Sequence, residues 1–235
     1  GHTETLTTAT QLVMDVAGVS IIGLGQGATR PNINFTAVGA NIPVTAANCR
    51  ISNICFVAGI ASVVVPLTVS GANFELDNCR FTFSATTFSF VTSFLTTAGA
   101  TYLNVHNCKF ETEVAATTAV CALNMVGLLM PRIMDCSFNG TYTNAPLIGS
   151  GVLSSQAEIG RCTSYNSIAS VAYAALDLGA VNTTGNMFDC QFGSLYATPA
   201  PKMARTANMM CYNVRVTGAV ARRGAALIPA TSPTT

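Results

Sequence analysis

The chain has 235 residues and a formal net charge of +1; half of its residues are apolar and only 9% are charged. A net charge this small gives no electrostatic reason to expect nucleic acid or an anionic membrane surface as a partner. No uninterrupted apolar run approaches the ~18 residues that a membrane-spanning helix needs. We therefore expect neither a nucleic-acid partner nor a membrane partner.

The N-terminal part of the chain carries a glycine-rich segment. Gly23, Gly25 and Gly27 alternate with other residues, as glycines do in phosphate-binding loops. Such a loop must lead into a helix whose N-terminus faces the phosphate, whereas Pro31 and another extended segment follow here. The segment therefore predicts a tight corner in the first coil of a repeat, and residues 1–17 are expected to form an N-terminal cap or first coil.

A short phrase with a central cysteine recurs along the chain at an almost constant spacing. The cysteines of its clear copies lie 29, 28, 26 and 28 residues apart, at Cys79, Cys108, Cys136, Cys162 and Cys190. Weaker copies occur at 32–35, at 51–56 and near 213–216. Units repeated at this period bury their apolar face only by stacking on their neighbours. The repeat predicts seven to eight coils within one domain spanning residues 1–218.

Apolar and polar residues alternate within each copy, which indicates a strand and not a helix. In the first clear copy, Leu76, Cys79 and Phe81 are expected to point inward, Asp77 to face outward, and Asn78 to lie at a bend with its side chain directed at backbone groups. The bend column contains Asn78, Asn107, Asp135, Arg161 and Asp189. The predicted fold is all-β, a single-stranded right-handed parallel β-helix.

The cysteines allow three interpretations. Buried free thiols are favoured, because cysteine packs as a small hydrophobe and a column of five cannot pair completely. Disulfides remain an alternative, since strands on neighbouring coils lie about 4.8 Å apart. Zinc is the least favoured, because the chain lacks C-x-x-C pairs.

Acidic residues are few, and the alignment of the coils brings two of them near a histidine. Stacking the coils places Asp77 beside His106, and Glu75 in the neighbouring outward column. A glycosidase needs two carboxylates across a groove, about 5–10 Å apart, with aromatic residues to hold the sugar. Tryptophan is absent and Arg80 and Lys109 lie near Glu111, so an ion-paired surface ladder is the preferred interpretation.

Apolar residues also occupy outward positions, namely Met134, Phe188, Cys55 and Phe83. Outward apolar groups on a sparsely charged solenoid predict that another subunit covers one face. After the last copy the strand pattern stops, and residues 219–235 are expected to form an extended C-terminal arm, with a frayed terminus as the alternative.

The segments at 1–6 (Gly-His-Thr-Glu-Thr-Leu) and 19–31 resemble the opening of pectate-lyase-like β-helix proteins of tailed bacteriophages, and the Asn-Cys-x-Phe coils follow the same pattern. The resemblance implies a virion component, typically a homotrimer, on the capsid or on the tail. It implies no active site, because the Asp cluster and basic residues with which pectate lyases bind calcium and remove a proton are absent.

We therefore expect a virion structural protein and not an enzyme, most consistent with a capsid decoration or cement protein on the capsid surface. Its expected partners are copies of itself, as a homotrimer, and the major capsid protein or other virion proteins. No catalytic, cofactor-binding or metal-binding residues, and no cofactor, are expected. The alternative is a tail spike or fibre domain that binds or cleaves host surface glycan.

Overall fold

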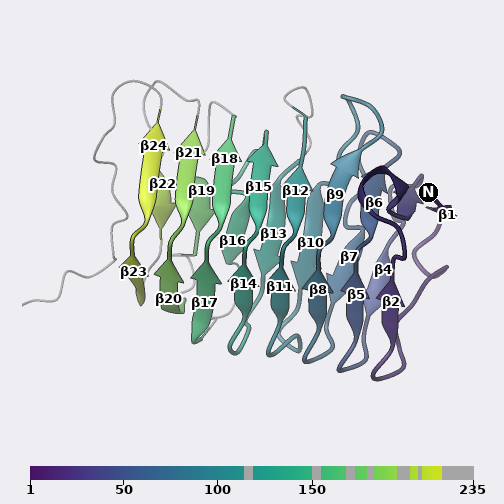
Figure 1. The fold of residues 1–235 in the computed structure, drawn as a ribbon, viewed down its shortest axis with the longest axis horizontal. Helices are drawn as coiled ribbons and strands as arrows, with labels where there is room; N and C mark the ends of the chain where they lie inside the picture. Colours follow the sequence, from purple (N-terminus) through teal and green to yellow (C-terminus); the bar gives the residue numbers. More distant parts are fainter. Residues whose placement is uncertain are drawn as a thin grey trace, which may run out of the picture.

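The computed structural model describes residues 1–113, 119–149, 155–167, 173–178, 183–194, 202–205 and 208–218. Its strands form three parallel sheets of nine, seven and eight strands, wound as a right-handed β-solenoid (Figure 1). The fold predicted from the repeat is confirmed, and the strand counts are close to the seven to eight coils expected. Helix is limited to η1 (Gly27–Thr29), and no helix in the described part of the chain could cross a membrane.

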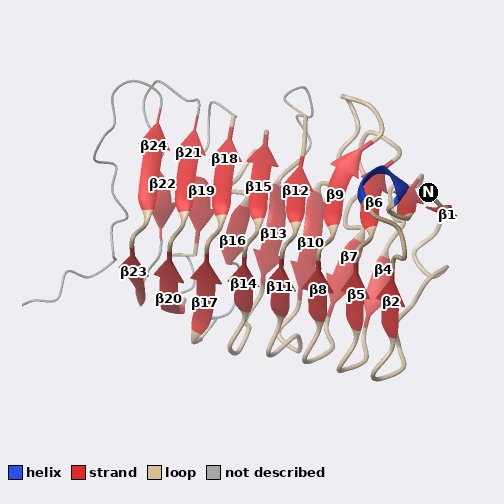
Figure 2. Ribbon diagram, in the orientation of Figure 1, coloured by secondary structure: helices blue, strands red, loops and turns tan. Residues whose placement is uncertain are grey.

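Each coil runs through sheet C, crosses a short bend into sheet A, and returns through sheet B (Figure 2). Sheet A contains β1 (Thr3–Leu6), β3 (Asn32–Phe35), β6 (Cys55–Ala58), β9 (Arg80–Phe83), β12 (Lys109–Glu111), β15 (Ser137–Gly140), β18 (Thr163–Asn166), β21 (Gln191–Ser194) and β24 (Arg215–Gly218). Sheet B contains β4 (Ile42–Val44), β7 (Leu67–Val69), β10 (Thr92–Thr96), β13 (Cys121–Met125), β16 (Leu147–Gly149), β19 (Tyr173–Asp177) and β22 (Lys202–Arg205). Sheet C contains β2 (Ser20–Ile22), β5 (Arg50–Ser52), β8 (Glu75–Asp77), β11 (Asn104–His106), β14 (Arg132–Met134), β17 (Ala157–Gly160), β20 (Thr184–Phe188) and β23 (Asn208–Tyr212).

The inward columns are aligned as the repeat predicts. The apolar column of sheet C is fully buried and consists of Leu76, Val105, Ile133, Ile159 and Met187. In sheet A, the rings of Phe56, Phe81, Phe110 and Phe138 stack with centroids 4.5, 4.7 and 5.0 Å apart. Ser164 continues this column and is also buried. Stacked identical side chains thus fill the interior along the solenoid axis.

The cysteine column is buried between the apolar and aromatic columns, as expected. All nine cysteines are thiols in this structure. Cys136 illustrates the packing: its Sγ lies 3.1 Å from the carbonyl oxygen of Met134 and 3.7 Å from that of Val105 in the preceding coil. The thiols therefore act both as small core side chains and as weak donors to backbone oxygen.

The bend column between sheets C and A is confirmed, but the predicted role of its side chains is wrong. Every bend residue has a φ between +47° and +59°, a left-handed conformation that Asn and Asp tolerate: Asn53, Asn78, Asn107, Asp135, Arg161, Asp189 and Asn213. The backbone N–H of Asn78 already donates to the carbonyl oxygen of His106 in the next coil, at 3.1 Å. The side chain of Asn78 instead binds another side chain along the outside, with its Nδ2 3.2 Å from Asn53 Oδ1. Among the bend residues, Asn53 does donate to backbone carbonyl oxygens.

The glycine-rich segment forms the expected corner. A Cβ atom on Gly25 would collide with the carbonyl oxygen of Thr29, and Gly27 has a φ of +54° at the start of η1. Asn53 closes the corner, because its Nδ2 donates to the carbonyl oxygens of Gly23 and Gly25 at 2.7 and 2.6 Å. Gly23 and Gly25 are thus needed for close backbone approach and Gly27 for its left-handed conformation, and no phosphate-binding helix follows in the described part of the chain.

The predicted outward direction of Met134 and Cys55 is confirmed, but neither side chain is exposed. Met134 faces outward from sheet C but is only 3% exposed, since it packs with Phe188 over Gly160 on the strand between them. A Cβ on Gly160 would lie 2.8 Å from Cε of Met134 and would collide with the ring of Phe188. The missing side chain leaves a depression that the two neighbours fill. Cys55 also faces outward from sheet A and is buried beneath longer neighbours. The predicted arm at 219–235 lies outside the described residues.

Candidate functional site

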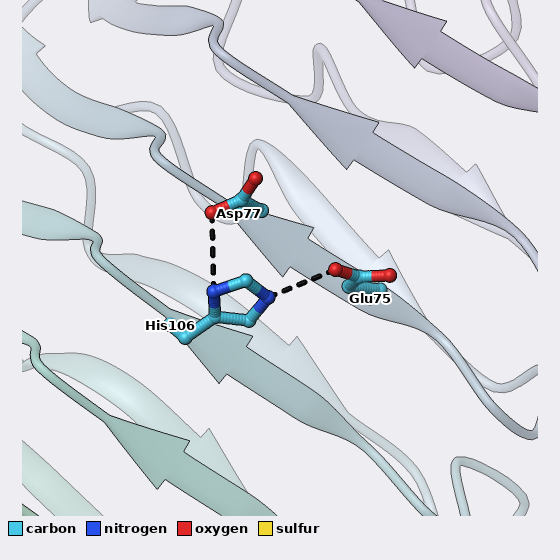
Figure 3. A group of neighbouring side chains, drawn as sticks. All are labelled: Glu75, Asp77 and His106. Carbon is cyan, nitrogen blue, oxygen red and sulfur yellow. Dashed lines mark hydrogen bonds and ion pairs between the residues drawn. The ribbon is translucent and has the colours of Figure 1, made fainter.

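The outer face of sheet C carries a cluster of ionisable side chains from strands β5, β8 and β11. His106 lies between two carboxylates of the preceding coil, with Nε2 2.9 Å from Glu75 Oε1 and Nδ1 3.1 Å from Asp77 Oδ1 (Figure 3). The parallel register places His106 beside Asp77 and Asn104 beside Glu75, as the coil alignment predicted. The histidine therefore reaches one acid in its own outward column and one in the adjacent column.

Asp77 accepts hydrogen bonds from several directions. Arg50 and Ser52 donate to Oδ2 at 2.9 and 3.1 Å, and Asn107 donates to Oδ1 at 3.2 Å. Partial burial by itself raises the pKa of Asp77, but the hydrogen bonds from Asn107 and Arg50, with the nearby His106, outweigh burial and lower the pKa. Asp77 is therefore held as a carboxylate.

The cluster is already paired, which argues against acid–base catalysis. Both ring nitrogens of His106 have protein partners: Nε2 faces Glu75 Oε1, and Nδ1 lies 3.1 Å from both Asp77 Oδ1 and Asn107 Nδ2. The hydroxyl of Ser52 donates to Asp77 and so is not activated by the imidazole. Neither ring nitrogen of His106 is free of protein partners, so a substrate would have to displace one of them before the ring could act on it.

A metal ion is the other chemical possibility at this cluster. The ligand atoms of Glu75, Asp77 and His106 lie within 4.8 Å of one another. The guanidinium of Arg50, however, lies 2.9 Å from Asp77 and 3.7 Å from Glu75, so a protein cation already balances these carboxylates. The residues fit an internal ion-paired network better than a cation site.

Ion pairs continue along the outside of the solenoid, as the ladder hypothesis predicted. Arg161 binds both carboxylate oxygens of Asp135, at 2.7 and 2.6 Å. Arg132 lies 3.0 Å from Glu158, and Arg80 lies 2.6 Å from Glu111. These pairs lie at the surface, where solvent and salt weaken the attraction between the charges, so they add little to stability. Their main consequence is that the charges of the lateral face neutralise one another.

A cavity of about 550 Å³ opens on the outer face of sheet A, next to the ladder. Four aligned outward residues from successive coils, Asn32, Cys55, Arg80 and Lys109, run along it. The remaining lining residues are Gly27, Ala28, Arg30, Asn78, Cys79, Asn107 and Glu111. The short side chain of Cys55 between longer neighbours creates the hollow, and η1 with Arg30 lines its N-terminal end.

The sequence interpretation missed this cavity. It treated Arg80 and Lys109 only as neighbours of Glu111, although the aligned column of short and cationic residues was readable from the repeat. The contribution of Arg30 was not readable, because η1 lies outside the repeat. Comparison of the chain with known proteins finds no matching protein-family model, no matching curated protein and no matching solved structure.

Proposed function

We propose that the protein is a structural component of a bacteriophage virion, a capsid decoration or cement protein that acts through contacts with copies of itself and with other virion proteins. The observation that carries this proposal is an apolar stripe on the outside of sheet C. We define the apolar stripe as Met134, Phe188, Met210 and Tyr212.

Along the outer face of sheet C, the outward side chains change from charged to apolar toward the C-terminal coils. Near the middle of sheet C the outward column contains Asp77 and His106, and beyond Gly160 it contains Phe188 and Tyr212. Met210 and Tyr212 are 59% and 52% exposed. Large apolar side chains gathered on one face are typical of a surface that a partner covers.

A symmetric homotrimer would cover this stripe on every copy of the protein. Closed rotational symmetry buries the same surface on every copy and leaves no free apolar patch for further growth. The paired charges of the ladder add little net charge that would oppose close approach. At the other end of the same sheet, Ile22 and Leu24 are exposed, and this second apolar surface is available to the major capsid protein or another virion protein.

Electron microscopy of intact particles tests the virion role. Gold-labelled antibodies against the purified protein are expected to decorate the capsid shell of the phage that encodes it. Labelling confined to the tail would instead support the second candidate function, a tail spike or fibre domain that binds host surface glycan. The cationic cavity on sheet A favours that alternative. Absence of label from every part of the particle would contradict both.

A further inference from the structure

We propose that Cys55, in the cavity on sheet A, is a modification site at which its thiol exchanges with a small disulfide that carries carboxylates. The cavity is separate from the apolar stripe, which lies on sheet C toward the C-terminal end of the described coils. The proposal therefore stands on its own, whether the protein occupies the capsid or the tail.

Cys55 is an exception in its outward column on sheet A. On the other strands of the sheet the parallel register aligns it with residues that are all polar or charged, namely Thr3, Asn32, Arg80, Lys109, Ser137, Thr163, Gln191 and Arg215. Cys55 is only 8% exposed, because the side chains on the two flanking strands are longer. Its thiol therefore lies at the floor of the cavity and faces outward into it.

The thiol of Cys55 also differs from the other cysteines in its bonding. Each of the other eight has its Sγ within hydrogen-bond distance of a backbone or hydroxyl oxygen. Among the described residues, the thiol of Cys55 has no such partner. It faces instead a cavity of about 550 Å³, within the range of about 300–1,000 Å³ that is usual for small-molecule sites. The site thus offers an unpartnered thiol and room for a reagent.

Three cations around the thiol supply binding groups for carboxylates. The positive charges of Arg80 and Arg30 act on Cys55 and lower the pKa of its thiol, although burial is the larger cause and raises the pKa overall. Arg80 is already bound to Glu111 through Nε and a terminal nitrogen, both at 2.6 Å. The buried Nε of Arg30 has no hydrogen-bond partner, and Lys109 has no hydrogen bond or ion pair within the described part of the chain. Cationic donors are thus available to an incoming carboxylate.

The exchange needs only the thiolate of Cys55 and the disulfide. The thiol loses its proton to water, and Sγ attacks one sulfur of the reagent, forming a mixed disulfide. The reagent's own S–S bond breaks, and its other half leaves as a thiolate that takes up a proton from water. One disulfide replaces another, so no further oxidant is required. Because burial raises the pKa of Cys55, the rate should increase as the pH rises above neutral.

Peptide mapping by mass spectrometry, after timed incubation of the purified full chain with three disulfides, tests the proposal. The probes are glutathione disulfide, which is anionic, 2-hydroxyethyl disulfide, which is neutral, and cystamine, which is cationic. Cys55 should react about tenfold faster with glutathione disulfide than with cystamine at low salt, because the cavity attracts anions. Size alone would favour the smaller cystamine. Added salt should reduce the preference, and denaturation should abolish it. Cys211, partly exposed on β23, is the internal control and should not share the preference.

Variants of the cavity cations separate steering by charge from simple access. Lys109→Gln and Arg30→Gln should each slow the reaction of Cys55 with glutathione disulfide about threefold and leave its reaction with 2-hydroxyethyl disulfide unchanged. Arg132→Gln, which removes a cation of sheet C outside the cavity, is the matched control and should alter neither rate. The proposal is overturned if folded Cys55 is not modified by glutathione disulfide, if it reacts equally fast with all three disulfides, or if Lys109→Gln and Arg30→Gln leave its preference intact.

Discussion

Asp77 and His106 face each other on adjacent strands of sheet C, with Oδ1 and Nδ1 3.1 Å apart. Neither residue could form this contact within its own coil, because the two are brought together only when β11 stacks on β8. The contact therefore depends on correct coil stacking, and its loss reports on the register of the solenoid.

Replacing Asp77 by Asn should lower the free energy of unfolding by about 1–2 kcal/mol at neutral pH, because Arg50 and His106 lose a charged acceptor. The pKa of Asp77 is lowered in the folded state from its ordinary value of 3.8. Its contribution is therefore present above that ordinary value and is lost as the pH falls through the lower folded-state pKa. Thermal unfolding between about pH 6 and pH 2 should show a smaller acid-induced loss for Asp77→Asn than for the wild type. The matched control is Asp15→Asn, at an exposed position; identical pH profiles for Asp77→Asn and the wild type would contradict this account.

The bend column predicts an unusual order of substitutions at Asn78. Its φ is +50°, so Asn78→Gly should unfold at a higher denaturant concentration than Asn78→Ala, by about 1 kcal/mol in free energy. Both variants lose the hydrogen bond to Asn53, so their difference isolates the backbone conformation. Chemical denaturation of the two proteins is the measurement. An alanine variant as stable as the glycine variant would argue against the left-handed bend.

Two glycines in different loops of the solenoid should respond differently to alanine. A Cβ on Gly71 would collide with the carbonyl oxygen of Ala46 in the preceding coil, whereas a Cβ on Gly39 would meet nothing within 4 Å. Gly71→Ala should cost about 1–3 kcal/mol because backbone must move, and Gly39→Ala should be nearly neutral. Thermal melts of both variants compare them directly. Equal melting temperatures would show that the coils are not packed as closely as described.

The cysteine column predicts slow thiol chemistry in the folded protein. Burial raises the pKa of Cys108 well above its ordinary value, and all five column thiols are buried, so a reagent can reach them only when the coils open. Mass spectrometry after brief labelling should find the five column cysteines unmodified in the native protein and fully modified after denaturation. Rapid native labelling at Cys108 or Cys136 would contradict their inward orientation.

Much of the fold was predictable because every coil of a solenoid repeats the same pattern of strands and bends. The spacing of Cys79, Cys108 and the later cysteines set the coil length, and alternation within each phrase assigned residues to the inner and outer faces. The pairing of His106 with Asp77 then followed from the register alone. Ion pairing was also foreseeable, since opposite charges occupy neighbouring positions of the outward columns.

The exposure of outward side chains was not predictable, because it depends on the volume of side chains in neighbouring coils, which one copy of the repeat does not reveal. Alternation correctly faced Met134 outward, but its burial depends on Gly160 in the next coil leaving space. Cys55 is the reverse case, because a small outward residue between Asn32 and Arg80 opens a cavity. The outward direction of a side chain was therefore readable from the sequence, whereas its exposure required the neighbouring coils.

Sedimentation of the purified protein at micromolar concentration tests the central claim, self-association through the apolar stripe, most directly. The wild type is expected to sediment as a trimer, and a double variant, Met210→Asn with Tyr212→Asn, as a monomer with an unchanged circular dichroism spectrum. Both substituted side chains are outward and exposed, so the fold should tolerate the change. A wild-type protein that remains monomeric at these concentrations, or a trimer that the double variant leaves intact, would contradict the account.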